Sequence, residues 1–181
     1  DHGKYLARAL EVANMLERMV QELLTVSRME TSQGSGDRAE RFDCVKLVQG
    51  YLGSQEDLAA KKGLEVHCSL PEEVFISGNQ LLMEKVFSNL IGNAVKYTPQ
   101  GGEIFLSACE KQGKYEFSVE NTGAHIPEES FPKLFDAFYR VEQSRNRSTG
   151  GSGLGLYIVQ KILGQHGSVC TVENTEKGVR F

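Results

Sequence analysis

Apolar residues recur at three- and four-residue spacing along the first thirty positions of the chain. This spacing predicts one long helix from Lys4 to about Ser32. The apolar stripe is wider than one neighbour can cover, and such a width is typical of a helix in a bundle. Its members are Leu6, Ala9, Val12, Ala13, Met15, Leu16, Met19, Val20, Leu23 and Val26.

A polar stretch with three breaker residues, Gln33 to Glu40, follows that helix and predicts a linker. A second unit then begins at Phe42, with Asp43 as the N-cap of a helix that runs to about Lys62. The pattern therefore divides the chain into a helical segment (1–33), a linker (34–41) and a larger unit (42–181).

The larger unit alternates helices and strands. Period-two alternation predicts strands, and apolar residues at helical spacing predict helices. About thirty irregular residues follow Asn121, and an ordered loop of that length is typical of a functional lid. The order of elements predicts an α+β fold, a two-layer α/β sandwich with a mainly antiparallel mixed sheet. The expected elements are strands Leu64–Leu70 and Val74–Ile76, helix Gly78–Tyr97, hairpin strands Glu103–Glu110 and Lys114–Glu120, helix Gly153–Gln165, and strands Val169–Asn174 and Val179–Phe181.

Composition narrows the functional classes. A net charge of −4 and an isoelectric point near 5.6 argue against broad affinity for nucleic acid or anionic membranes. No apolar run approaches the length of a membrane span, so any membrane attachment is expected outside these residues. The four scattered cysteines lack the spacing of a zinc site and predict free thiols in a reducing compartment. The chain opens inside a helical pattern and stops inside a strand pattern, as an excised segment would.

The predicted helix Gly78–Tyr97 carries a polar edge. Asn89, Asn93, Lys96 and Tyr97 fall at i, i+4, i+7 and i+8 and share one face. Amide oxygens can ligate Mg²⁺, an ammonium can meet phosphate, and a tyrosine ring can lie against a base. The same pattern also fits a half-exposed amphipathic helix whose polar residues face water.

Two glycine-containing segments follow. The first, Val119 to Pro127, places Asn121 and Gly123 at a strand end, which is also compatible with a plain turn. The second, Gly150 to Tyr157, contains alternating glycines at the start of an apolar helix, where free backbone N–H groups bind anions. It lacks the Gly-Lys-Ser/Thr of a Walker loop and the preceding strand of a Rossmann fingerprint.

In this order the three segments resemble the N, G1 and G2 boxes of the GHKL superfamily of ATPases and kinases. Between them, Phe135 to Arg140 resembles the F box of sensor histidine kinases. Leu23 to Glu30 resembles the end of the second helix of the histidine kinase dimerisation bundle. The resemblance implies a Bergerat fold with helices on one face of the sheet over 42–181, and a partial bundle helix over 1–33.

One position of the resemblance separates hydrolysis from phosphotransfer. The hydrolysing relatives have a water-activating glutamate at the first N-box position, where this chain has Asn89, which cannot act as a general base. The resemblance thus implies a protein-histidine kinase. Two alternatives stay open, namely a degenerate GHKL docking module that does not use ATP and a serine kinase or anti-sigma type relative.

The resemblance also implies roles for particular residues. Asn93 is the expected Mg²⁺ ligand with Asn89 beside it. Lys96 and Arg140 are expected to act on the phosphates, with Arg145 or Arg147 as further candidates. Phe135 and Phe138 either anchor the lid or pack in the core. The full expected set for ATP is Asn89, Asn93, Lys96, Tyr97, Asn121, Gly123, Ile126, Phe138, Arg140, Gly151, Gly153, Leu154, Gly155 and Leu156.

Two positions depart from the family pattern. Asn121 stands where the G1 box has an aspartate that accepts from the adenine amino group, and a neutral amide is a weaker acceptor. His125 replaces the second G1 glycine. Both departures predict nucleotide binding of modest affinity.

None of the four histidines lies in the His-Asp/Glu-x-Lys/Arg-Thr/Ser-Pro pattern of the family's phosphoacceptor. The chain is therefore expected to bind ATP or ADP without phosphorylating itself. The resemblance implies further partners for the whole protein, namely a response-regulator receiver domain and a second copy joined through the helical bundle. It also implies that this segment is the cytoplasmic part of a membrane sensor.

Overall fold

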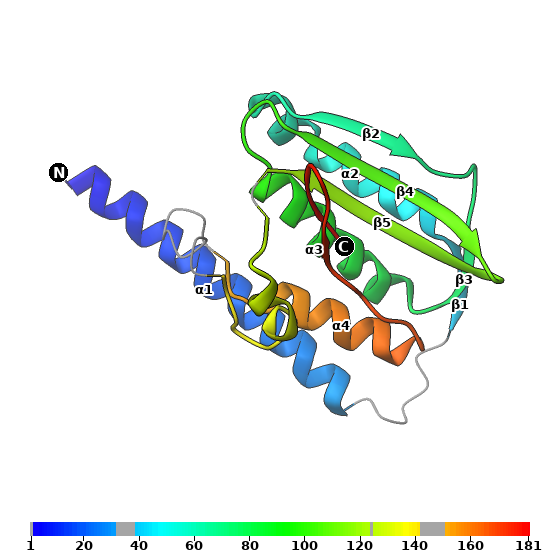
Figure 1. Ribbon diagram of the computed structural model, residues 1–181. Helices are drawn as coiled ribbons and strands as arrows, with labels where there is room; N and C mark the ends of the chain where they lie inside the picture. Colours follow the sequence, from blue (N-terminus) through cyan, green and yellow to red (C-terminus); the bar gives the residue numbers. More distant parts are fainter. Residues whose placement is uncertain (1, 32–38, 124, 142–150) are drawn as a thin grey trace.

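The computed structural model describes residues 2–31, 39–123, 125–141 and 151–181. A 30-residue helix, α1 (His2–Thr31), opens the chain and extends beyond the rest of the molecule at its N-terminal end (Figure 1). The other elements are β1 (Glu40–Asp43), α2 (Cys44–Lys61), β2 (Glu65–Ser69), β3 (Phe75–Gly78), α3 (Gln80–Tyr97), β4 (Glu103–Lys111), β5 (Lys114–Thr122), the 3₁₀ helix η1 (Glu128–Lys133), α4 (Gly155–Gln165), β6 (Glu173–Asn174) and β7 (Gly178–Arg180).

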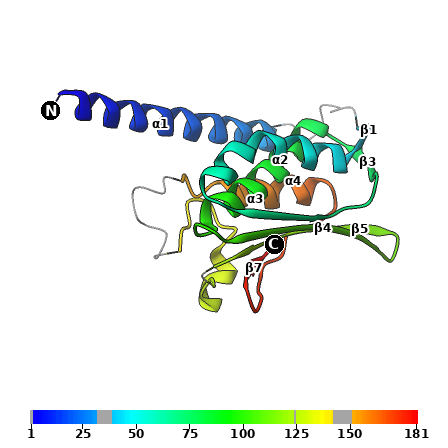
Figure 2. The ribbon, with the colours of Figure 1, turned by 90° about the horizontal axis from the view of Figure 1, so that it is seen from above.

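The main sheet has five strands in the order β2-β4-β5-β7-β6. Strands β2 and β4 run parallel, with Glu65 opposite Glu103, and the remaining neighbours are antiparallel. Helices α2, α3 and α4 cover one face and leave the other open (Figure 2). The predicted two-layer α+β fold with a mainly antiparallel mixed sheet is confirmed.

The core lies between the sheet and the three helices. Helix α3 occupies its centre, and α4 adds an apolar face beside it. These side chains supply most of the hydrophobic stabilisation because each is removed almost completely from water. The fully buried set includes Ile91, Val95, Ile104, Leu154, Ile158, Val159 and Ile162.

Helix α1 packs on this domain through its C-terminal half, beside α4 (Figure 1). Met29 is 7% exposed within the core, and its carbonyl oxygen accepts a hydrogen bond from Gln165 Nε2 at 3.4 Å. On another face of α1, Leu16 and Val20 are more than half exposed. The wide apolar stripe therefore packs against the larger unit on one side and, among the described residues, stays exposed on a second side. No helix among the described residues has the length and hydrophobicity to cross a membrane.

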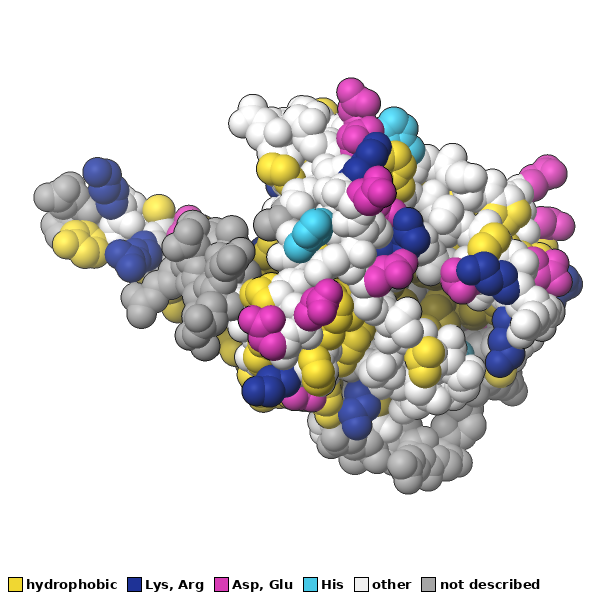
Figure 3. Space-filling model, viewed as in Figure 1, with side chains coloured by type: hydrophobic (Ala, Val, Ile, Leu, Met, Phe, Trp, Pro, Cys, Tyr) yellow, Lys and Arg dark blue, Asp and Glu magenta, His cyan; other side chains and the backbone are white. Residues whose placement is uncertain are grey.

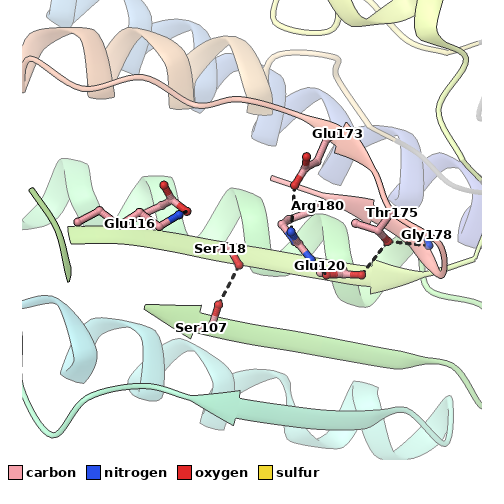
Figure 4. A network of polar contacts seen from close by, with 9 residues as sticks. Ser107, Glu116, Ser118, Glu120, Glu173, Thr175, Gly178 and Arg180 are labelled. Atoms are coloured by element: carbon pink, nitrogen blue, oxygen red, sulfur yellow. Dashed lines mark hydrogen bonds and ion pairs between the residues drawn. The ribbon is translucent and has the colours of Figure 1, made fainter. Parts of the chain in front are cut away.

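The open face of the sheet carries side chains of both charges (Figure 3). A polar network ties β5 to β7 and β6 there, with Arg180 Nη2 2.7 Å from Glu120 Oε2 and Arg180 Nη1 3.0 Å from Glu173 Oε1 (Figure 4). Burial alone would raise the pKa of Glu120. Hydrogen bonds from Thr175 and Arg180, together with the Arg180 charge, outweigh burial and hold that pKa below its usual range.

The structure corrects several expected boundaries. Glu40 and Arg41, assigned to the linker, pair with β3 as part of β1. The strand expected over Val169–Asn174 is limited to its last two residues. Strand β2 is an edge strand, so its alternating apolar side chains remain partly in water, and Val66 is 39% exposed. All four cysteines are free, and burial raises the pKa of the Cys170 thiol to about 11.

Candidate nucleotide-binding site

Helix α3 supplies the polar edge of the site. Its N-cap Asn79 accepts a hydrogen bond from Leu82 N at 3.1 Å, which fixes where the helix begins. Asn89 Nδ2 donates to the Lys85 carbonyl oxygen at 2.9 Å, so the Asn89 amide oxygen is the atom left to face the site. Because α3 is buried along its opposite side, its polar edge has a fixed direction.

The C-terminus of α3 is held by a partly buried ammonium group. Lys62, the C-cap of α2, directs Nζ at three backbone carbonyl oxygens that the helix end leaves without intrahelical partners. Loss of hydration lowers the pKa of Lys62. The three acceptors are Val95 O at 2.7 Å, Lys96 O at 3.0 Å and Thr98 O at 2.6 Å. This cap therefore fixes the turn that presents Lys96 and Tyr97.

The glycine-rich turn before α4 lies directly against that edge. A Cβ at Gly151 would stand 2.9 Å from Lys96 Nζ, and one at Gly155 would stand 2.8 Å from Asn89 Oδ1. Gly153 has a φ of +75°, which side chains rarely adopt. Gly153 is the position that requires glycine, because a Cβ there would also stand 2.8 Å from the backbone carbonyl carbon of Phe138. At Gly151 and Gly155 a side chain would displace the ends of the Lys96 and Asn89 side chains.

Strand β5 brings the G1-like segment to the same place. Asn121 is 9% exposed, and its Nδ2 donates to the Thr122 carbonyl oxygen at 3.3 Å, so the amide oxygen remains to accept another bond. Ile126 is held by two hydrogen bonds, from its N–H to Asn174 Oδ1 at 3.0 Å and from Asn174 Nδ2 to its carbonyl at 2.8 Å.

These three segments surround one cavity of about 570 Å³, which is within the usual size of small-molecule sites. Most of the residues predicted from the sequence line it: Asn89, Asn93, Lys96, Tyr97, Asn121, Ile126, Arg140, Gly151, Gly153, Gly155 and Leu156. The sequence pattern thus brings together residues that are up to 67 positions apart, from Asn89 to Leu156.

Three predicted residues do not line the cavity, namely Gly123, Phe138 and Leu154. Phe138 is 56% exposed with a φ of +66°, and its backbone N–H donates to the Gly153 carbonyl oxygen at 2.9 Å. Phe138 therefore shapes the turn through its backbone rather than its ring. Leu154 is buried in the core. Arg145 and Arg147 lie outside the described residues.

The pattern missed other lining residues, above all those of α1. Met15, Arg18, Met19 and Glu22 share one face of that helix and form a wall of the cavity. Met15, Met19 and Glu22 are half-buried and fall at i, i+4 and i+7. A charged residue at helical spacing from two apolar ones, as Glu22 is, could have indicated that this face of α1 meets a polar site. The remaining unpredicted lining residues are His125, Leu134, Tyr139, Val141, Ser152, Val179 and Phe181.

The fold and this cavity define an ATP-binding domain of the GHKL type, and comparison with known proteins gives the family. Residues 78–181 match the family described as histidine kinase-, DNA gyrase B- and HSP90-like ATPase. The chain belongs to this family, and its domain is the ATP-binding catalytic domain of the histidine kinases within it.

The similar proteins are sensor kinases. The chain is 35% identical over 181 residues to sensor protein VanSB of Enterococcus faecalis, covering all of this chain and 40% of that protein. The catalytic domain of histidine kinase ThkA superposes with a TM-score of 0.71 at 28% identity, covering 79% of this chain and 91% of that one. ThkA in complex with response regulator TrrA has a TM-score of 0.74 at 24% identity, covering 94% and 47%, and shows the fold alone. The chain spans less than half the length of the curated relative.

Proposed function

We propose that this chain binds Mg·ATP in the cavity between α3 and the glycine-rich turn, as the catalytic part of a protein-histidine kinase. The observation that carries the proposal is that Asn93, Lys96 and Gly151 line the same cavity of about 570 Å³, with Gly151 directly against the Lys96 ammonium group. An ammonium group, a carboxamide and free backbone N–H groups at a helix start are the groups that bind a polyphosphate.

The two ends of the cavity suit the two ends of ATP. Asn121, Ile126 and Leu134 give the β5 end an amide acceptor beside apolar surface, as a purine base requires. Tyr97 can lie against the base or the ribose, and the Lys96 ammonium group, which is 4.9 Å from the centroid of the Tyr97 ring, can meet the phosphates that follow. Arg140 also lines the cavity and adds a second cation for the phosphates.

The residues present fit a magnesium ion. Asn93 lines the cavity, and no described residue gives its carboxamide a hydrogen bond, so its oxygen is available as a hard ligand. When bound, Mg²⁺ would neutralise charge on the phosphate oxygens. Asn89 would stand beside it, with its amide orientation set by Lys85.

Asn89 favours phosphotransfer over hydrolysis. Its carboxamide cannot take a proton from water, and its nitrogen is already committed to the Lys85 carbonyl oxygen. In the transfer, an imidazole nitrogen of a histidine outside this chain would form a bond to the γ-phosphorus while the bond to ADP breaks. Lys96 and Arg140 would stabilise the charge that develops, and the phosphate would pass on to an aspartate.

The partners follow from the same proposal. A response-regulator receiver domain is the expected phosphate acceptor, and the solved complex of ThkA with TrrA supports this choice for a similar protein. The exposed Leu16–Val20 side of α1 is the expected surface for a second copy within a helical bundle. We expect the protein to be a membrane sensor with this domain in the cytoplasm.

Calorimetric titration of Mg·ADP into the chain and its Asn93→Ala variant tests the proposal. We expect saturable binding that weakens tenfold or more in the variant, which corresponds to about 1.4 kcal/mol. Asn14→Ala, an exposed asparagine on α1 outside the cavity, is the matched control and should bind like the parent. Absence of binding by all three would favour a docking module that does not use ATP.

A second measurement separates binding from catalysis. None of the four histidines has the acceptor pattern, so incubation of the chain with γ-labelled ATP should leave it without acid-labile, base-stable phosphate. Such a label on the purified chain would contradict the assignment of the acceptor to another segment.

A further inference from the structure

Helix α1 places a carboxylate at the glycine-rich turn. Ser152 Oγ donates a hydrogen bond to Glu22 Oε2, although the two residues are 130 positions apart. The same hydroxyl oxygen accepts a hydrogen bond from Leu154 N at 3.1 Å, so both functions of the hydroxyl are in use. Glu22 is half-buried and lines the cavity together with Ser152.

The position of this carboxylate is that of an anion site. The turn opens α4, an 11-residue helix whose N-terminus carries partial positive charge and favours negative groups. The Lys96 ammonium group lies against Gly151 of the same turn. A side chain of this chain therefore occupies, through Ser152, the region that phosphate groups of a nucleotide would enter.

We propose that Glu22 and the nucleotide phosphates compete for the turn around Ser152, so that helix α1 is docked on the free site and is released when a nucleoside diphosphate or triphosphate binds. This inference rests on the proposed function. Two anions cannot share the same hydroxyl donor and the same helix N-terminus without strong repulsion, because the half-buried site screens charge poorly.

The neighbouring side chains of α1 make the release cooperative. Met15 and Met19 line the same cavity on the same face of the helix as Glu22, and Met29 is buried farther along it. A rigid helix cannot move its Glu22 turn away from Ser152 without disturbing these contacts. Binding of phosphate is thereby coupled to the position of the whole helix.

The test compares Mg·ADP and adenosine on the parent, Glu22→Gln and Glu22→Ala. Removing the charge should strengthen Mg·ADP binding fivefold or more in both variants and leave adenosine binding unchanged, because adenosine has no phosphate. Glu17→Gln removes the same charge from an exposed position of α1 outside the cavity and should match the parent. If the parent binds Mg·ADP and Glu22→Gln binds it no more tightly, the competition is wrong while the proposed function stands.

Hydrogen exchange gives a second readout that does not depend on affinity. Exchange of α1 amides between residues 15 and 29 should rise when saturating Mg·ADP is added to the parent, but not with adenosine. In Glu22→Ala it should already be raised without nucleotide. Unchanged exchange in Glu22→Ala would overturn the proposal, and absence of Mg·ADP binding by every variant would overturn both it and the proposed function.

Discussion

The ammonium group of Lys62 stabilises both the fold and the nucleotide site, because it caps the end of α3 that carries Lys96 and Tyr97. Lys62→Met keeps the apolar stem of the side chain but removes the ammonium group and its three donated hydrogen bonds, to the carbonyl oxygens of Val95, Lys96 and Thr98. These oxygens belong to the last turn of α3 and the residue that ends it, so the variant leaves the helix end without its cap.

The magnitude follows from the number and kind of bonds. Hydrogen bonds from a charged group contribute about 1.5–3 kcal/mol each. The cost of burying the ammonium group, which lowers the pKa of Lys62, offsets much of this sum. Water can also reach part of the exposed helix end. We therefore expect a net loss of about 2 kcal/mol, or about 4–8 °C in melting temperature for a domain of this size.

The assay is thermal unfolding with and without Mg·ADP, with Lys61→Met as the matched control. Lys61 is the exposed neighbour of Lys62, so the control removes the same charge without a cap. Lys62→Met should also bind Mg·ADP more weakly, because Lys96 and Tyr97 lie in the loosened turn. Unfolding of Lys62→Met within a degree of the Lys61→Met control would refute the capping argument.

Three further changes test other parts of the structure. Glu120→Gln should lower the free energy of unfolding by about 1 kcal/mol at pH 7. The loss is small because Arg180, the partner of Glu120 in the ion pair, is partly exposed to water. Despite burial, Arg180 and Thr175 hold the folded-state pKa of Glu120 below its unfolded value near 4.3. The ionised Glu120 therefore stabilises the fold above its unfolded pKa, and this stabilisation is lost as the pH falls through the folded pKa. The urea midpoints of the parent and of Glu120→Gln should accordingly converge below pH 4. Gly153→Ala should lower the free energy of unfolding in urea by about 2 kcal/mol and weaken Mg·ADP binding, because Gly153 has a positive φ. Gly164→Ala is the control and should be neutral or stabilising, because Gly164 has open space around it. Asn121→Asp should tighten Mg·ADP binding by calorimetry, and no gain would contradict the weak-acceptor explanation.

The elements that the sequence predicted well have local causes. Asp43 caps α2 as expected, with Oδ1 accepting from Val45 N at 3.0 Å. Gly113 adopts a positive φ at the expected hairpin turn, as glycine favours. The polar edge of α3 follows from helical spacing alone. In each case the signal lies within a few residues, so no knowledge of the tertiary structure was needed.

The missed features depend on contacts distant in sequence. Strand β1 exists because Glu40–Asp43 pairs with β3, about 35 residues later, and nothing in its own four residues indicates a strand. Phe138 does not line the cavity and instead contacts Gly153 through its backbone N–H. An aromatic residue in a motif identifies the segment but does not fix the direction of the ring.

In helix α1, one feature followed from local spacing and another depends on contacts distant in sequence. Its spacing predicted more than one neighbour, but spacing cannot tell which side of the stripe meets which neighbour. The structure assigns the Met15–Met19–Met29 side to the catalytic domain and leaves the Leu16–Val20 side uncovered. A helix with both sides occupied in a bundle could not also contact Ser152 through Glu22 without bringing the catalytic domain with it. The proposed release of Glu22 by phosphate would therefore free the catalytic domain to move relative to α1.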